Sequence, residues 1–337
     1  MSEIAAGSMR AGWRSRVNAG VETARGAPDA RRLLQLALAG IWLLVALLQY
    51  QSFMFSSGFS QMIGATAAGN PRVVASPISW DATLVAHHPA LNAIFATIQL
   101  LLAIGIAWRP TVRLALAASI AWALGVWWFG EGLGMVLTPS ASPVNGAPGA
   151  VIIYALLAAL LWPADRSGRP APFTAARAVG APIARALWLV LWLSLAYFAL
   201  LPGNRAPQAL NGMIASMESG EPGWLAALER GAASVVAHQG LAASVVLAVA
   251  LVIIAVGVYL PSGAAKTALV LAIVVAAVIW VFGEAFGAIL TGGGTDPNSG
   301  PLLMLLALTY WPARAMVTAP ARTVLTPPGA NEGTTAS

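Results

Sequence analysis

Two segments of the sequence place a glutamate inside the same glycine-rich pattern. Glu131 lies in Phe129-Gly-Glu-Gly-Leu-Gly134, and Glu284 lies in Phe282-Gly-Glu-Ala-Phe-Gly287. Each follows a long apolar run, where an ionisable side chain is costly unless it is hydrated, paired or facing an internal cavity. The two glutamates are therefore candidate site residues. A structural role, in which each pairs with an Arg or accepts backbone N–H groups of the next loop, stays open.

The glycines beside the glutamates have a spacing that permits close helix packing. Gly130 and Gly134 are four positions apart, as are Gly283 and Gly287. Small residues at this spacing let helix backbones approach one another. We expect each Glu to be held against a neighbouring helix.

A histidine recurs together with the glutamates. Val85-Ala86-His87 reappears as Val236-Ala237-His238, 151 positions later. We expect His87, His238 and the two glutamates to lie at one depth and to form a polar pocket. Zn, Cu, Mn or Fe accepts two His and two carboxylates, and two His alone suit a haem. A metal at His87 and His238 and a plain anchoring role both stay open, because no short ligand spacing such as HExxH is present.

Other polar residues have no repeated counterpart. Asp296 has no acidic equivalent earlier in the chain, which argues against its belonging to a duplicated site, and the role of His88 is undefined. Gln49 and Gln99 lie inside apolar runs, where hydrogen bonding between helices is the expected role.

Several chemistries are excluded by what the sequence lacks. There is no GxSxG, no P-loop and no GxGxxG after a strand, so catalysis of the kind found in soluble enzymes is not expected. The absence of Cys excludes disulfides, thiolate metal sites and haem attached through CxxCH. The net charge of +6 comes from Arg residues beside apolar runs, where charge sets membrane topology, so no nucleic-acid partner is expected.

The elements that must position these residues are membrane helices. Of 337 residues, 58% are apolar and 9% charged, and 13 are Trp, with a mean hydropathy of +0.77. That leaves too little polar surface to coat a soluble globule, so the lipid bilayer is the expected partner. At 1.5 Å per helical residue, eight apolar runs approach the length needed to span the roughly 30 Å bilayer core. They lie near 33–55, 90–108, 111–130, 147–163, 184–201, 240–260, 265–283 and 300–316.

The order of features recurs along the chain. The histidine motif recurs after 151 positions, the glutamate pattern after 153, and Trp162-Pro163-Ala164 reappears as Trp311-Pro312-Ala313 after 149. An ordered set of matches at a nearly constant offset indicates an internal duplication. We therefore predict an all-α integral membrane protein with two four-helix units, at 33–163 and 184–316, each with a polar loop and a short amphipathic helix after its first span.

The charge distribution predicts how the units sit. With eight spans, fifteen of the eighteen Lys and Arg fall on one side, leaving Arg72, Arg205 and Arg230 on the other. If the short fourth and eighth runs were re-entrant, the units would be inverted and the split would be twelve against six. The positive-inside rule then favours parallel units related by a pseudo-two-fold along the membrane normal, with both termini cytoplasmic and the glutamates facing outward. The remaining segments are a basic N-terminal segment (1–32), a cytoplasmic linker (164–183) and a disordered tail (317–337). A bacterial inner (plasma) membrane is the expected location.

One stretch is similar to a known family. Ile98-Gln99-Leu100-Leu101-Leu102-Ala103-Ile104-Gly105, followed by Arg109 and Arg113, resembles the second helix and basic turn of DoxX-type four-helix membrane proteins. The chain departs from that family at Gln99, where an acidic residue is common, and at Gly58-Phe59-Ser60-Gln61. The resemblance implies membrane redox work, such as quinone-linked thiosulfate oxidation, and a partnership with oxidative-stress enzymes.

Three functions stay open at this point. The first is a DoxX-like redox subunit or accessory protein whose pocket at Glu131, Glu284, His87 and His238 holds a quinone headgroup, a haem or a divalent metal, with another membrane or periplasmic redox protein as partner. The second is a small-solute or proton-coupled transporter that uses the paired glutamates. The third is a membrane scaffold with no chemistry of its own.

Overall fold

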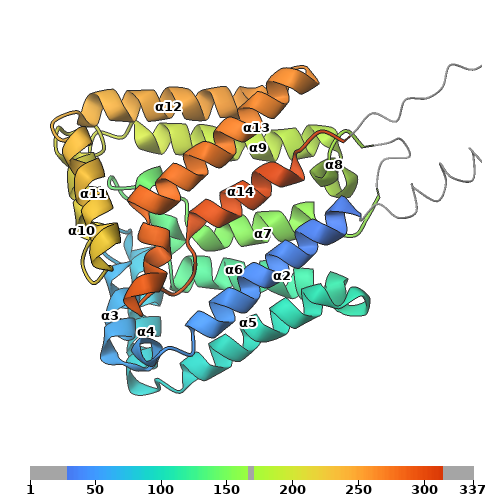
Figure 1. Ribbon diagram of the computed structural model, residues 1–337. Helices are drawn as coiled ribbons and strands as arrows, with labels where there is room; N and C mark the ends of the chain where they lie inside the picture. The colour runs from blue at the N-terminus through green and yellow to red at the C-terminus, as the bar shows by residue number, and fades with distance from the viewer. Residues whose placement is uncertain (1–28, 166–170, 314–337) are drawn as a thin grey trace, which may run out of the picture.

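The computed structural model describes residues 29–165 and 171–313, and in these ranges the chain is helical throughout (Figure 1). The only β-type pairing among these residues is an isolated bridge between Phe173 and Pro312. The predicted disordered tail, 317–337, and most of the basic N-terminal segment lie outside the described residues. The ranges 29–165 and 171–313 are called the first and second halves below.

The first half contains six α-helices and four single turns of tighter helix. The α-helices are α2 (Ala30–Leu48), α3 (Ser57–Ala65), α4 (Arg72–His87), α5 (Leu91–Ala107), α6 (Val112–Phe129) and α7 (Ala150–Leu160). The turns are η1 (Ser52–Phe55), η2 (Arg109–Thr111), η3 (Gly132–Met135) and η4 (Pro143–Asn145).

The second half follows a similar order after a short helix. It contains α8 (Thr174–Val179), α9 (Ala181–Ala199), α10 (Ala209–Met217), α11 (Gly223–Val236), α12 (Gly240–Gly257), α13 (Ser262–Val278), η5 (Ile279–Gly283), η6 (Ala285–Thr291) and α14 (Ser299–Thr309). In each half the polar loop after the first long helix carries two short helices, where the sequence predicted one.

Five helices in the described chain are long and apolar enough to cross a membrane, or up to six if α4 and α5, which meet at a bend of 108°, count as one span. The sequence predicted eight. The two doubtful elements are α7 and α14, which have only 11 residues each and so reach about 16 Å at 1.5 Å per residue. Each of these two helices is preceded by a loop, at 130–149 and 284–298, that contains only short turns of tighter helix.

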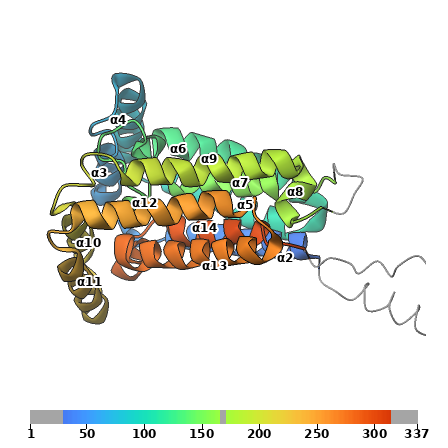
Figure 2. The same ribbon diagram turned by 90° about the horizontal axis from the view of Figure 1, so that it is seen from above.

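The long helices run side by side in a bundle, and Figure 2 shows α3 with α4 and α10 with α11 projecting on opposite sides at one end. At that end, called the loop end, Gln49 Nε2 donates to the Thr295 carbonyl (3.1 Å) and Asn204 Nδ2 to the Ala141 carbonyl (2.8 Å). These bonds join the two halves through their loops, so residues of one half can line a site in the other.

The opposite end, called the linker end, gathers the start of α2 and α9 and the last turns of α7 and α14. Arg31 Nη2 donates to the Ala164 carbonyl (3.1 Å), and Tyr310 OH donates to the Ala184 carbonyl (2.5 Å). Each short helix is therefore fixed at its end to the start of the first long helix of its half.

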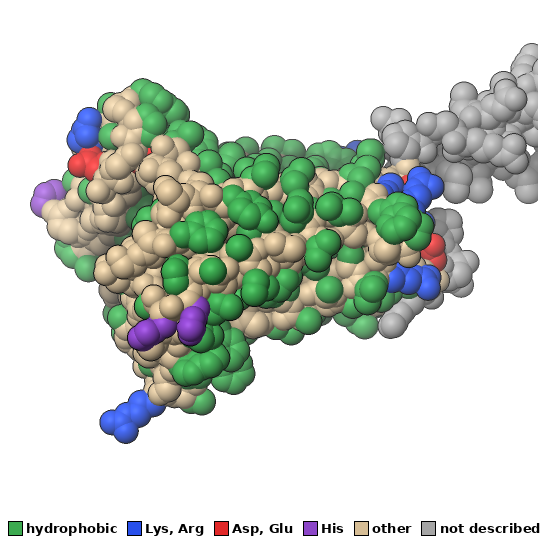
Figure 3. Space-filling view, turned by 90° about the horizontal axis from the view of Figure 1, so that it is seen from below, with side chains coloured by type: hydrophobic (Ala, Val, Ile, Leu, Met, Phe, Trp, Pro, Cys, Tyr) green, Lys and Arg blue, Asp and Glu red, His purple; other side chains and the backbone are tan. Residues whose placement is uncertain are grey.

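Aromatic side chains fill the centre, while aliphatic side chains cover the outside. Trp42 packs on Tyr154 with ring centroids 4.4 Å apart, and Trp188 packs on Tyr310 at 4.6 Å, all of them buried. Leu114 is 74% exposed, and Figure 3 shows apolar side chains spread over the long helices. An all-helical bundle with several apolar helices and an apolar outer surface is consistent with a membrane protein.

Candidate functional site

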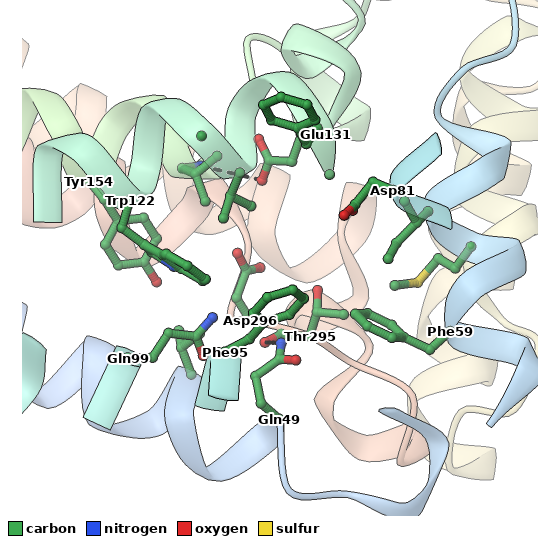
Figure 4. Close-up of a pocket in the computed structure, with 18 of the residues that line it drawn as sticks. Gln49, Phe59, Asp81, Phe95, Gln99, Trp122, Glu131, Tyr154, Thr295 and Asp296 are labelled. Atoms are coloured by element: carbon green, nitrogen blue, oxygen red, sulfur yellow. Dashed lines mark hydrogen bonds between the residues drawn. The ribbon is translucent and has the colours of Figure 1, made fainter. Parts of the chain in front are cut away.

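A cavity of about 440 Å³ lies in the first half, beside the loop that leads into α14 (Figure 4), and it reaches the surface of the bundle, because its lining residues Trp80 and Phe129 are exposed. Its wall comes from α2, α3, α4, α5, α6 and α7, and from Thr295 and Asp296 of the second half. This volume falls in the range of small-molecule sites. Aromatic rings form much of the wall: Phe59, Trp80, Phe95, Trp122, Phe129 and Tyr154.

Glu131 reaches this cavity because α6 ends just before it. The backbone N–H groups of Gly130 and Glu131 both donate to the Val126 carbonyl, at 2.8 and 2.9 Å, which closes the helix and turns the chain. Glu131 Oε1 accepts from the Val151 N–H (3.4 Å) at the start of α7, and Oε2 is buried without a partner among the described residues. The carboxylate thus keeps one oxygen without a hydrogen-bond donor among the described residues.

Gly149 is required for this position of Glu131. Its φ is +103°, in the region that favours glycine, and a Cβ placed there would collide with Glu131 Oε2. Any side chain at 149 would therefore displace the carboxylate.

Glu284, the repeated partner of Glu131, contacts the start of α14 as Glu131 contacts the start of α7, and it makes more hydrogen bonds there. Its carboxylate accepts from the Ser299 N–H (3.3 Å), the Ser299 hydroxyl and the Gly300 N–H (3.0 Å) at the start of α14, and the residue is 2% exposed. It does not line the cavity. For Glu284 the geometry is that of an acid stabilising a helix N-terminus.

Two aspartates join Glu131 at the cavity. Asp296 Oδ1 accepts from the Asn298 N–H (2.7 Å), and Asp81 comes from α4. Figure 4 shows the carboxylates of Asp81, Glu131 and Asp296 facing the same space. Sequence reasoning set Asp296 aside because it is not duplicated, and it did not single out Asp81. No pattern of spacing connects them, since they come together only by packing.

Three neutral polar atoms at the other side of the cavity also have no partner. They are Gln99 Oε1, Trp122 Nε1 and Tyr154 OH, each buried and without a hydrogen bond among the described residues. Figure 4 places Gln99, Trp122 and Tyr154 together, away from Asp81. An unsatisfied buried polar group costs about 1–3 kcal/mol, so a cavity that keeps several is suited to a ligand that satisfies them.

The histidines lie elsewhere. His87 and His238 are exposed, and they line neither this cavity nor a smaller cavity that adjoins it. His87 Nδ1 is 2.7 Å from the Thr83 carbonyl on its own helix, and His238 Nδ1 is 2.9 Å from Gln208 Nε2. The described residues contain no group of three or more His, Cys, Asp or Glu arranged to hold a metal. The four predicted pocket residues are therefore not gathered at this cavity: of them only Glu131 lines it.

The glycines of the glutamate pattern approach loops. A Cβ on Gly134 would meet the Pro148 carbonyl, one on Gly287 the Asp296 carbonyl, and one on Gly283 the Val144 carbonyl. Gly130 faces only Val126 of its own helix. These glycines admit the loops before α7 and α14 into the bundle, and Gly283 brings η5 against η4 of the other half.

Comparison of the chain with models of protein families, with curated proteins and with solved structures finds no match in any of the three. The resemblance to DoxX-type proteins stays a prediction.

Proposed function

We propose that this chain is a multi-pass membrane transporter that binds one small amphipathic organic cation in the cavity of its first half. The observation that carries the proposal is the cavity lining. Asp81, Glu131 and Asp296 contribute carboxylates, while none of the described lining residues is Lys, Arg or His. A buried carboxylate without a countercharge is strongly disfavoured, and a bound cation supplies that countercharge.

The aromatic wall favours an organic cation over a bare ion. Faces of Trp, Tyr and Phe attract cations by about 0.5–2 kcal/mol each, more when water is excluded. Apolar rings also bind the hydrocarbon part of the ligand. Gln99 Oε1, Trp122 Nε1 and Tyr154 OH lie together beyond the acids, so the ligand would carry a neutral polar group as well as its charge.

The repeat architecture supports a single site in each chain. Trp127 Nε1 donates to the Pro148 carbonyl (2.7 Å), and Trp280 Nε1 to the Pro297 carbonyl (2.8 Å), equivalent bonds in the two halves. We propose on this basis, and on the offsets in the sequence, two parallel four-helix units. At those offsets the acid Glu131 is kept as Glu284, but four other lining residues become apolar: Asp81, Gln99, Trp122 and Tyr154 correspond to Ala232, Leu251, Val275 and Leu303.

The proposed orientation places the loop end outside a bacterial inner membrane and both termini inside. It is supported by the charge asymmetry, since of the ten Lys and Arg that the structure describes only Arg72, Arg205 and Arg230 lie toward the loop end. The cavity, whose wall includes Thr295 from the loop end, would then receive its ligand from the outer side or the outer leaflet.

A binding panel tests this function. Purified protein in detergent is titrated with ethidium, an aromatic cation, and with an uncharged aromatic compound of the same size. We expect ethidium to bind at least ten-fold more tightly, because about 1.4 kcal/mol of ion pairing corresponds to that factor. Equal binding would remove the charge argument. Uptake of ethidium into proteoliposomes with an imposed pH gradient then distinguishes a transporter, which accumulates ethidium, from a scaffold, which does not.

A second candidate is the DoxX-like redox subunit, favoured by the two unpartnered donors Trp122 Nε1 and Tyr154 OH. They would donate to the carbonyl oxygens of a quinone headgroup. A quinone, when bound, supplies two-electron, two-proton redox chemistry, and a membrane or periplasmic redox protein would be the electron partner. A short-chain benzoquinone in the same panel distinguishes the candidates: saturable quinone binding without ethidium binding would favour the redox function.

A further inference from the structure

We infer that a second, polar cavity at the loop end is the aqueous entrance to the ligand cavity, with Glu131 and Asp296 at the boundary between the two. This inference rests on the proposed function, because it assigns the route by which the cation reaches that site. It adds the loop residues Thr66, Asn145 and Asn298, which do not line the first cavity.

The two cavities adjoin along a shared wall. The second cavity is about 260 Å³, and it has Met62, Ile63, Gly130, Glu131, Thr295 and Asp296 in common with the first. Glu131 and Asp296 therefore line both cavities. Asp81 and the aromatic rings Trp80, Phe95 and Trp122 line only the first.

The lining of the second cavity is suited to water. Beyond the shared wall it consists mainly of loop residues with accessible amide and hydroxyl groups, including Thr66, Asn145 and Asn298, and of glycines that leave the backbone uncovered. Asn145 is exposed, which places the mouth of this cavity at the surface of the loop end. Polar, hydrated walls lower the cost of carrying a charge toward the acids.

Charge selection follows from the position of the two acids. A solute entering past Asn145 meets Glu131 and Asp296 before it meets the aromatic rings. A narrow passage lined by one sign of charge concentrates ions of the other sign and raises their rates of arrival by ten-fold or more. The passage should therefore admit cations and repel anions before any binding occurs.

The absence of Cys from the sequence gives a direct test, because a single introduced thiol has no background. Asn145→Cys probes the mouth and Gly125→Cys probes the ligand cavity beyond the acids. A Cβ at Gly125 meets no atom within 4 Å, and the same is true of the exposed Gly40 on α2, so Gly40→Cys is a matched control facing lipid. Ala121→Cys is a second probe of the cavity.

The reagents are two membrane-impermeant methanethiosulfonates, one with a trimethylammonium group and one with a sulfonate, added from the loop-end side of proteoliposomes. We expect Asn145→Cys and Gly125→Cys to react and Gly40→Cys to stay unmodified. The ratio of the cationic to the anionic reaction rate measures charge selection. This ratio should be about ten-fold higher at Gly125→Cys than at Asn145→Cys. Glu131→Gln with Asp296→Asn should abolish that preference.

Two results would overturn the inference. One is that Gly125→Cys and Ala121→Cys are both inert while Asn145→Cys reacts, and the other is that both reagents modify Gly125→Cys at equal rates. Neither result bears on the proposed function, which is decided by ethidium binding to the wild-type protein. Failure of ethidium binding with intact, charge-selective labelling would instead reject the function and keep the entrance.

Discussion

The cavity is defined by polar atoms that the fold buries without partners, and Tyr154 is the clearest of them. Its side chain is 1% exposed and its hydroxyl has no hydrogen bond among the described residues. Tyr310, at the end of α14 in the second half, is also buried and packs on Trp188, but its hydroxyl donates to the Ala184 carbonyl. The two tyrosines therefore form a natural pair for comparison.

Tyr154→Phe should leave the free energy of unfolding unchanged or raise it by about 1 kcal/mol, because an unsatisfied hydroxyl is removed from the interior. Tyr310→Phe should lower it by about 1–2 kcal/mol, because it removes a buried hydrogen bond from the hydroxyl to the Ala184 carbonyl. Thermal unfolding in detergent measures both. A larger loss in Tyr154→Phe than in Tyr310→Phe would mean that Tyr154 has a structural partner and is not held for a ligand.

A second residue-scale prediction concerns Glu229, on α11 outside the long apolar helices. Burial, followed by the charges of Glu221 and Glu218, raises the pKa of Glu229 to about 7. The folded state then holds this proton more tightly than the unfolded state does. Its stabilising effect is complete below the unfolded pKa of about 4.5 and is lost as the pH rises to about 7.

The thermal midpoint should therefore fall between about pH 5 and pH 7, and Glu229→Gln should flatten that dependence. Asp165→Asn is the control, since Asp165 lies at the linker end, where Arg177 and Arg31 hold the pKa of its carboxyl below the ordinary value and so outside this pH range. A profile that is unchanged in Glu229→Gln would show that Glu229 is not the titrating group.

At the scale of the elements, α6 leaves room for a ligand at Gly125, which lines the cavity without a side chain. A Cβ there meets nothing within 4 Å, although the residue lines the cavity. Gly125→Leu should fill the cavity and weaken ethidium binding at least ten-fold with little change in stability, as measured by fluorescence titration. Gly40→Leu, in an equally open place on α2, should bind as wild type. Equal loss in both variants would place the ligand elsewhere.

The long helices could be predicted from the sequence, and the loops could not. Apolar runs near 90–108 and 111–130 match α5 and α6 within about two residues, because length and hydropathy alone define such helices. The runs at 147–163 and 300–316 shrink to the 11-residue α7 and α14, which end before Trp162-Pro163 and Trp311-Pro312, because proline does not continue a helix. The loops that precede these helices enter the bundle. Positive φ at residues such as Leu133 and Phe286 marks these loops, and no apolar pattern encodes it.

The candidate site was only partly predictable from the sequence. Glu131 could be selected from its place at the end of an apolar run, and it lines the cavity. Asp296, Gln99 and Tyr154 come from three other elements, and only tertiary packing brings them to Glu131. The sequence repeat also indicated Glu284 and the histidines. In the structure Glu284 binds the N-terminus of α14, and the histidines lie on the surface.

At the scale of the whole molecule, the two halves have a common order of elements but unequal linings. The first half provides the cavity, and the second half closes it with the loop that carries Thr295 and Asp296. Duplication followed by loss of polar lining in one copy would leave a single site with a wall from the other copy. The parallel arrangement also requires the linker between the halves to lie on the same side as both termini, and a reporter inserted after Pro163 should therefore be cytoplasmic.

Equilibrium binding of ethidium to purified protein tests the central claim most directly. We predict one ethidium bound per wild-type chain, at least ten-fold weaker binding in the Glu131→Gln, Asp296→Asn variant, and wild-type binding in Glu218→Gln, which removes a carboxylate remote from the cavity. Binding of two molecules per chain, or wild-type affinity in the double variant, would contradict a single acidic cavity that selects a cation.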